Sequence, residues 1–281
     1  MLEVRYGEKI STPSALVLGG FDGLHLGHRA LLKEAKKTGL PVVITTMLGA
    51  KGSALFTKEE RAFVFEGTNI DFVYEIPFTE ELKNTEAEAF LAALFGCINA
   101  KQVFCGEDFR FGKGARGTLE LLKTFAPVCV VETVKADNEK VSTSLCKQCL
   151  KENNFEKLSR LLGANAYFIE GIVEHGRQVG RTYGFPTLNL SIPPEKLLPQ
   201  DGVYGGFADT PKGRYSTIIN IGSRPTFGVE ERKVEAYLKG FSGDLYGATV
   251  RIYPTEFLRE IKKFSSEEEL RKQLQRDIGR L

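Results

Sequence analysis

A run of glycines separates an apolar strand pattern from a helical pattern near the start of the chain. The run Gly19-Gly20-Phe21-Asp22-Gly23-Leu24-His25-Leu26-Gly27-His28 follows the apolar residues 15–18 and precedes the helical pattern at 29–35. This order predicts a strand, a tight turn and a helix. Glycines let backbone N–H groups approach a ligand closely, and the positive end of the helix dipole points back at the turn. The turn therefore suits an anion such as a phosphate.

Two histidines stand at the expected start of that helix. His25 and His28 are three residues apart, so a helix that begins near them would project both imidazoles from one side of its first turn. Two donors would then face the same anion. Two other interpretations remain open: the turn is only a tight connection, or the imidazoles ligate a metal ion with Asp22 as the third ligand. The chain contains no Gly-x-x-x-x-Gly-Lys-Ser/Thr run, so the turn is not a Walker A loop.

Strand patterns and helical patterns alternate through the first half of the chain. We expect strands at 41–45, 70–75, 101–105 and 128–131, and helices at 58–65 and 85–95, the second with a capping box at its start. Such alternation predicts a parallel sheet covered by helices, with ligands at the carboxyl ends of its strands. Residues 1–154 are therefore expected to form a Rossmann-like α/β domain.

The pattern changes after residue 154. A short helical pattern over 155–163 ends in glycine, and beyond it short strands recur with turn signals between them. We expect strands at 167–174, 202–208, 215–221, 234–238 and 248–253, which is typical of an antiparallel barrel. The run 265–270 caps a terminal helix on which Leu270, Leu274 and Ile278 line one face. Residues 155–281 are therefore expected to form a second domain, a closed sheet with one helix.

Thr187 and Asn189 lie in the densest motif of the second half, the glycine-rich segment 175–189. In an extended segment two side chains that are two residues apart share a face. Their oxygens could then complete the shell of a magnesium ion that otherwise keeps waters and nucleotide phosphates. An ordinary turn with a Thr/Asn hydrogen-bond pair is the alternative, and the spacing alone favours it.

Charge and composition exclude several classes of protein. The net charge is only +2, from 38 basic and 36 acidic residues, so no global electrostatic argument favours a nucleic acid or an anionic membrane as partner. No apolar stretch approaches the roughly 20 residues of a transmembrane helix, and the first residues do not form a signal peptide. We therefore expect a cytoplasmic protein without nucleic-acid or membrane partners; its oligomeric state is not predicted.

The cysteines indicate reduced thiols rather than a disulfide framework, because their number, 5, is odd and the chain shows no export signal. Cys146 and Cys149 form a Cys-x-x-Cys that follows a plausible helix cap, which is the context of a redox motif. The chain lacks a second pair for zinc and a thioredoxin-length βαβ unit around the motif. A redox or metal role is therefore the minor alternative.

Residues 112–117 match the Gly-x-Gly-x-x-Gly pattern of a dinucleotide site. In such a site the pattern follows a strand immediately and opens a crossover helix. Here residues 106–111 intervene and the variable positions carry cations. We interpret the segment as a basic, flexible loop at the mouth of a site.

The first half resembles two related families. Gly-Phe-Asp-Gly followed by His-x-Gly-His is similar to the signature of the nucleotidyltransferase superfamily, and Gly106-Glu107-Asp108-Phe109-Arg110-Phe111-Gly112 resembles a segment of prokaryotic FAD synthetases. The resemblance implies that His25 and His28 bind nucleotide phosphates and stabilise charge as pyrophosphate leaves. It implies binding roles for further residues: Gly20, Phe21, Asp22, Gly23, Asp108, Phe109, Ser142, Thr143 and Lys147. Phe109 and Phe111 could pack on a flat ring, although buried core phenylalanines would give the same pattern.

The first half departs from this family in two places. A Phe-Glu-Pro-His-Pro run is replaced by residues 47–52, and a Ser-Ser-Thr-Arg-Ile-Arg run aligns with residues 142–147. Leu145 and Lys147 thus stand where the family carries arginines. Lysine keeps the charge but loses the planar two-pronged geometry that binds phosphate, so adenylyl transfer is expected to be weakened.

The second half resembles the riboflavin kinases. The run Gly-Arg-x-x-Gly-Phe-Pro-Thr-x-Asn is similar to their hallmark, and further segments follow in family order: 202–204, 220–227, Glu235, 244–247 and 257–260. Together the two halves resemble the prokaryotic bifunctional riboflavin kinase/FMN adenylyltransferases. An α/β nucleotidyltransferase domain followed by a riboflavin-kinase barrel with a C-terminal helix is the fold that this resemblance implies.

The kinase resemblance assigns roles to named residues. Thr187 and Asn189 would hold Mg²⁺ on ATP, and Glu235 would be the general base for the 5′-hydroxyl of riboflavin. A primary alcohol is a poor nucleophile near neutral pH, so a carboxylate within hydrogen-bond reach is chemically apt. A surface-facing strand Glu235 is the alternative. Gly176, Gly180 and Arg181 would cover the phosphates, and Arg259 would lie beside the flavin.

Three functional hypotheses follow. The first is an enzyme that phosphorylates riboflavin to FMN and then transfers AMP from ATP to FMN, giving FAD and pyrophosphate, with riboflavin, FMN and ATP as its partners. The second keeps the kinase and makes the first domain a degenerate nucleotide-binding module. The third treats the barrel as a nucleic-acid module, but the barrel segment shows no repeated aromatic platform beside a basic stripe.

Overall fold

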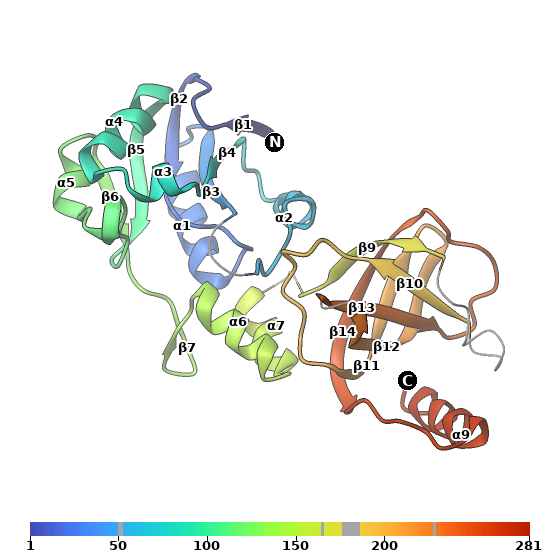
Figure 1. The fold of residues 1–281 in the computed structure, drawn as a ribbon. Coiled ribbons are helices and arrows are strands. Elements are labelled where there is room, and N and C mark those ends of the chain that lie inside the picture. Colours follow the sequence, from blue (N-terminus) through green and yellow to red (C-terminus); the bar gives the residue numbers. More distant parts are fainter. Residues whose placement is uncertain (50–52, 164–165, 176–185, 227–228) are drawn as a thin grey trace. The chain divides into compact units, whose positions relative to one another are not determined.

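The computed structural model describes residues 1–49, 53–163, 166–175, 186–226 and 229–281 (Figure 1). The chain divides into two compact units, residues 1–145 with 161–163, and residues 146–160 with 164–281. Each unit is described by itself below. No helix in the described part of the chain combines the length and apolar character needed to cross a membrane.

The first unit is built on a six-stranded parallel sheet with strand order β1-β4-β3-β2-β5-β6. Its strands are β1 (Leu2–Arg5), β2 (Ile10–Val17), β3 (Val42–Leu48), β4 (Phe72–Pro77), β5 (Ile98–Gly106) and β6 (Val128–Val131). The order runs outward in both directions from β2 and β5, so the chain changes direction between these two central strands. In such sheets ligands bind beyond the carboxyl ends of the strands at this switch point.

Helices cover both faces of this sheet. They are α1 (Leu26–Lys36), α2 (Lys58–Phe65), α3 (Glu80–Lys83), α4 (Ala87–Cys97) and α5 (Leu119–Lys123). Leu16 lies in one buried cluster with Leu91 and Leu94 of α4. Its neighbours Ala15 and Val17 point to the opposite face and are also fully buried. A strand covered on both sides reads as a continuous apolar run, which explains the sequence pattern of β2.

The expected capping box at the start of the 85–95 helix is wrong. α4 begins at Ala87, and its N-cap residue Glu86 makes no side-chain cap hydrogen bond. The Thr85 hydroxyl instead donates to the carbonyl of Glu81, 3.0 Å away, and so belongs to the preceding turn. A capping box does occur in α2, where the Thr57 side chain accepts from the backbone of Glu60 and the Glu60 carboxylate accepts from the backbone of Thr57.

The remaining elements before the barrel are short: the 3-10 turn η1 (Lys113–Ala115), the hairpin strands β7 (Lys135–Ala136) and β8 (Glu139–Lys140), and the helices α6 (Thr143–Lys151) and α7 (Phe155–Leu162). The Gly-x-Gly-x-x-Gly run forms η1 and its flanks. Gly112 has φ +69°, and a Cβ there would lie 2.7 Å from the Cα of Ala87. This glycine therefore serves a close backbone approach to α4. The run does not follow β5 directly and forms a 3-10 turn instead of opening a crossover helix, which a dinucleotide site requires.

The second unit contains a closed antiparallel barrel with strand order β10-β13-β12-β11-β14-β9, as the sequence predicts. Its strands are β9 (Ile169–Glu174), β10 (Thr187–Ser191), β11 (Gly202–Thr210), β12 (Gly213–Thr226), β13 (Val229–Leu238) and β14 (Thr249–Arg259). The helix α9 (Glu267–Ile278) follows, with Ser266 as its N-cap. The strand β10, which carries the Thr/Asn pair, is absent from the five strands expected from the sequence, because its apolar alternation is short and follows a glycine-rich motif.

Candidate active sites

A cavity of about 410 Å³ lies at the carboxyl ends of β2, β5 and β6, where the strand order predicts a ligand. The glycine-rich turn and the start of α1 form one wall, and the ends of β5 and β6 with the segment before α6 form the rest. The lining residues that the sequence predicts are Gly20, His25, His28, Asp108, Phe109, Ser142 and Thr143. Segments far apart in the chain thus meet in one site.

The two histidines stack on each other at the start of α1. Their ring centroids are 3.7 Å apart with planes inclined by 13°, and Phe21 stacks on the other face of His28 at 4.1 Å. His25 is the N-cap of α1, and its Nδ1 accepts a hydrogen bond from the backbone N–H of His28, 3.2 Å away. An accepting Nδ1 leaves the proton of the neutral His25 ring on Nε2. His25 therefore offers one N–H donor.

His28 is held in the other tautomer. Its Nδ1 lies 2.8 Å from the carbonyl oxygen of Gly23 and donates to it, so Nε2 carries the lone pair when the ring is neutral. Burial lowers the pKa of His25 to about 4. Burial, with His25 as a second cause, also holds the pKa of His28 well below its ordinary 6.5. Both rings are therefore neutral near pH 7 in the absence of an anion.

Helix starts and cations give the cavity a positive character. Ser142, Thr143 and Ser144 bring the start of α6 to the wall, and the Ser142 hydroxyl accepts from the N–H of Leu145 at 3.2 Å. The positive ends of α1 and α6 are thus presented to a bound anion. Arg110 and Lys140 also line the cavity, and Lys140 forms an ion pair with Asp108 that lowers the pKa of the Asp108 carboxyl. Sequence reasoning missed Lys140, which stands in a two-residue hairpin strand without a motif.

The barrel brings the predicted kinase residues together on one face. Thr187 and Asn189 are two residues apart in β10, so they share a face as predicted for an extended segment. Asn189 lies directly opposite Glu235 of β13. Side chains at directly opposite positions have Cβ atoms about 5 Å apart. Because Val234 and Ala236, on either side of Glu235, are fully buried, Glu235 points to the outside of the barrel with Asn189.

The arrangement fits a magnesium site in its chemistry. Mg²⁺ takes oxygen ligands and is usually held by one or two protein groups, waters and substrate phosphates. Thr187 and Asn189 supply a hydroxyl and an amide oxygen on one face. Neither side chain is engaged in a hydrogen bond with another described residue, so both oxygens are available to an ion.

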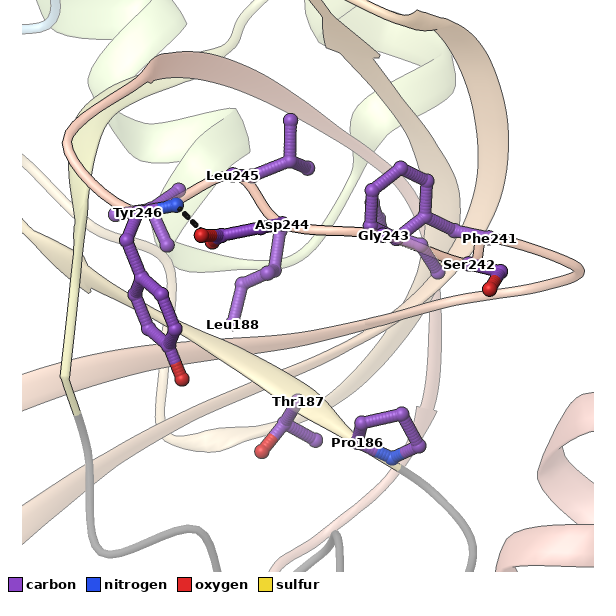
Figure 2. A pocket seen from close by; sticks show the side chains of 11 residues that line it. Pro186, Thr187, Leu188, Phe241, Ser242, Gly243, Asp244, Leu245 and Tyr246 are labelled. Atoms are coloured by element: carbon purple, nitrogen blue, oxygen red, sulfur yellow. Dashed lines mark hydrogen bonds between the residues drawn. The ribbon is translucent and has the colours of Figure 1, made fainter.

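A second cavity of about 410 Å³ adjoins Thr187 (Figure 2). It lies between the start of β10 and the loop 241–246, with Pro186 and Thr187 on one side and Asp244 and Tyr246 on the other. The Asp244 carboxylate accepts from the backbone N–H of Tyr246 at 2.8 Å, which stabilises the loop. A ligand in this cavity would therefore contact the Thr187 hydroxyl.

Comparisons with known proteins decide the family. Residues 7–145 match the FAD synthetase family model, and residues 163–281 match the riboflavin kinase family model. A bifunctional riboflavin kinase/FMN adenylyltransferase from Bacillus subtilis is 31% identical, covering 94% of this chain and 90% of its own length. The chain belongs to the bifunctional riboflavin kinase/FMN adenylyltransferase family. The Escherichia coli K12 protein of the same name is 30% identical over 93% of this chain.

One solved structure is similar over almost the whole chain. The crystal structure of a macrolide-efflux protein from Streptococcus pneumoniae aligns with a TM-score of 0.88 and 29% identity, covering 99% of this chain and 98% of that one. This chain thus shares its fold with that structure over almost its whole length. In this member of the bifunctional family, the fold is a parallel sheet followed by a closed barrel and a C-terminal helix.

Some residues assigned from the family resemblance lie elsewhere in the first unit. The Asp22 carboxylate accepts from the backbone N–H groups of Leu55 and Phe56, at 3.1 and 3.4 Å, and is not a cavity-lining group. Phe21 is fully buried against His28, and a Cβ at Gly23 would lie 2.8 Å from the Phe56 ring. No cluster of His, Cys, Asp or Glu among the described residues could hold a metal ion, so Asp22 does not complete a metal site with the stacked histidines.

The Phe109-Arg110-Phe111 segment divides between core and cavity. Phe111 is buried in the core cluster, while Phe109 stacks on it at 5.6 Å and also lines the cavity. Arg110 lines the cavity, whereas residues 112–117 are not among its lining residues. That the basic run forms a loop at the mouth of a site stays a prediction. Sequence alone could not separate the two phenylalanines, because both roles bury an aromatic ring.

The remaining predicted residues are placed as follows. Gly176, Gly180 and Arg181 lie outside the described residues. The Arg259 guanidinium forms an ion pair with Asp277 of α9, with Nη2 and Oδ2 2.8 Å apart, and the Asp277 side chain is only 3% exposed. Lys147 lies within α6, in the part of that helix that belongs to the second compact unit.

The Cys-x-x-Cys pair is built into α6. Cys146 and Cys149 form no disulfide bond and are buried at 0% and 2% exposure. They lie in the interior of the helix, not at its first residue. A reactive thiol of a redox motif needs exposure and a helix start, so this placement favours a packing role.

Proposed function

We propose that this chain carries out two ATP-dependent reactions of its family: phosphorylation of riboflavin to FMN, and transfer of AMP from ATP to FMN with release of pyrophosphate. We assign the second reaction to residues 1–154 and the first to residues 155–281, and we place the enzyme in the cytoplasm. The observation that carries the proposal is that both family models match one chain whose relatives are aligned over nine-tenths of their length.

In the adenylyl-transfer site the chain's contribution is electrostatic. FMN attacks the α-phosphorus of ATP through a phosphate oxygen, and the bond to pyrophosphate breaks, so negative charge develops on the leaving oxygen. The Nε2–H of His25 donates to a phosphate oxygen. An anion beside Nε2 of His28 favours the protonated ring, which then supplies a second donor and a positive charge. The starts of α1 and α6, with Arg110 and Lys140, add to this field.

In the kinase site the chain positions a base beside the phosphate-binding residues. Glu235 takes the proton from the 5′-hydroxyl of riboflavin as the oxygen attacks the γ-phosphorus of ATP. Thr187 and Asn189 would hold Mg²⁺, which neutralises charge on the phosphates when bound. The register that sets Asn189 opposite Glu235 brings the metal-holding residues and the base to adjacent strands. Proton removal and phosphoryl transfer can thus occur at one place.

The alternative is a riboflavin kinase whose first domain is a degenerate nucleotide-binding module. Leu145 and Lys147 at the positions of family arginines favour this alternative, because a charge-assisted, two-pronged phosphate contact is lost. The stacked histidines and the cationic cavity favour a working site.

Incubation of the pure protein with Mg²⁺, ATP and either riboflavin or FMN separates these possibilities. Formation of FMN from riboflavin and of FAD from FMN supports the proposal. FMN from riboflavin without FAD from FMN selects the kinase alone. Formation of neither product from an intact, folded chain contradicts both.

A further inference from the structure

The kinase residues belong to a longer row on the outside of the barrel. Each member lies directly opposite the next across neighbouring strands: Asn189 of β10, Glu235 of β13, Asn220 of β12, Val203 of β11 and Arg259 of β14. Directly opposite side chains share a face of the sheet. The row therefore runs across the strands, about 4.8 Å per step.

Asn220 occupies a particular place in this row, one strand beyond Glu235 on the side away from Asn189. Its neighbours Ile219 and Ile221 are fully buried in the barrel interior, so Asn220 points outward with Glu235. On that same face of β12 the nearest residues are Ile218, which is 5% exposed, and Gly222. A polar side chain between two apolar neighbours on a half-covered surface needs an explanation.

The Asn220 amide is available to a ligand. It is partly buried and makes no hydrogen bond with another described residue, and it is not a fully buried polar group that the fold must satisfy. A primary amide carries two N–H donors and a carbonyl acceptor. It therefore matches a hydroxyl group, which both donates and accepts.

The direction of the reaction decides which part of the substrate reaches Asn220. In an in-line transfer the attacking oxygen lies between the phosphorus and the carbon chain that carries it. With the phosphates at Thr187 and Asn189 and the attacking hydroxyl hydrogen-bonded to Glu235, the carbon chain of the alcohol extends toward β12. The next polar side chain that it meets in the row is Asn220, and Arg259 stands two strands further on.

We propose that Asn220 is a specificity-determining residue of the kinase site, which binds the secondary 4′-hydroxyl of the ribityl chain next to the reacting 5′-hydroxyl. The inference rests on the proposed riboflavin kinase function. A hydrogen bond from the Asn220 amide would make the enzyme selective for a polyhydroxylated chain. A substrate that lacks the 4′-hydroxyl would leave this amide unpaired.

The test compares Asn220→Ala with the wild-type chain on riboflavin and on 4′-deoxyriboflavin. We expect Asn220→Ala to lower kcat/KM for riboflavin about tenfold and to change kcat/KM for the deoxy analogue less than about twofold. FAD formation from FMN, which takes place in the other domain, should not change and reports the integrity of the chain. Ser216→Ala is the matched control, since Ser216 lies exposed on the same face of β12.

Equal losses on both substrates, or no loss on either, would overturn the assignment. A wild-type chain that makes no FMN from riboflavin would instead sink the proposed kinase function, which this design distinguishes. If Asn220→Ala does not accumulate as folded protein, Asn220→Ser serves, because it keeps a smaller hydroxyl donor and acceptor. The kcat/KM of Asn220→Ser for riboflavin should fall less than that of a variant with a nonpolar side chain. Its kcat/KM for the deoxy analogue should again change little.

Discussion

His25 and His28 stack at the start of α1 with ring centroids 3.7 Å apart, and their hydrogen bonds hold them in opposite tautomers. The neutral His25 ring carries its proton on Nε2, while Nε2 of His28 carries a lone pair that becomes a donor only on protonation. Two neutral rings can lie this close, whereas two imidazolium ions would repel each other. In the proposed adenylyl-transfer site, the pair would therefore gain one positive charge when a phosphate binds.

The burial of His25 predicts a pH-dependent stability. Its pKa falls from 6.5 in the unfolded chain to about 4 in the folded chain, so between these values the unfolded state binds more protons. The contribution of His25 to the free energy of unfolding, about 3 kcal/mol, is therefore fully present above about pH 6.5. It is lost as the pH falls toward 4. Thermal unfolding of His25→Asn, which keeps an N-cap acceptor, should show a flatter pH dependence than wild type between pH 4.5 and 7.

His175→Asn is the control for that measurement, because His175 is exposed. It should retain the wild-type dependence. An unchanged slope in His25→Asn would show that the burial of this ring does not limit stability in acid.

Asp22 is expected to act through the backbone of residues 55 and 56. Removing its carboxylate leaves the N–H groups of Leu55 and Phe56 without their acceptor, so Asp22→Ala should lower the free energy of unfolding by about 2 kcal/mol. Asp22→Asn keeps one acceptor oxygen and should lose less. Denaturant unfolding measures both. A fully stable Asp22→Ala with a raised KM for ATP would assign the residue to the ligand instead.

Lys140 should bind ATP and contribute little to stability. Its ion pair with Asp108 is solvent-exposed, with side chains 45% and 66% accessible, and such pairs are worth roughly 0 to 1 kcal/mol. Replacing a charge-assisted phosphate contact costs about 1.5 to 3 kcal/mol, so Lys140→Gln should raise KM for ATP in FAD formation about tenfold or more. Lys140→Arg should restore most of the affinity.

Lys37→Gln is matched to this variant, since Lys37 also forms an exposed ion pair, with Glu34, and lies outside the cavity lining. It should leave KM unchanged. The same KM in Lys140→Gln and wild type would remove Lys140 from the site.

Local patterns predicted the architecture because hydrophobic periodicity is a local property. The buried apolar run of β2, the 3.6-residue period of α1 and the alternating pattern of the barrel strands can all be recognised in the sequence alone. The predicted capping box of α4 was wrong because the Thr85 hydroxyl donates to the carbonyl of Glu81 instead. This hydrogen bond depends on how α3 ends. Tertiary contacts of this kind are not encoded in a capping motif.

The sites were predictable to the extent that motifs mark them. His25, His28, Thr187, Asn189 and Glu235 stand in recognisable runs, whereas Lys140 enters the cavity from a hairpin whose sequence carries no signal. Asn220 becomes notable only through the strand register that sets it beside Glu235. Asp22 is the opposite case. It stands in a recognisable motif, but its carboxylate contacts the backbone and does not line the cavity.

The central claim is that one chain holds two separate catalytic sites, and paired variants test it most directly. His28→Ala should still convert riboflavin to FMN at the wild-type rate while FAD formation from FMN falls by about 10²-fold or more. Glu235→Ala should show the reverse, with FMN formation reduced about 10²-fold to 10⁴-fold and FAD formation intact. Loss of both activities in either folded variant, or full FAD formation by His28→Ala, would contradict the account.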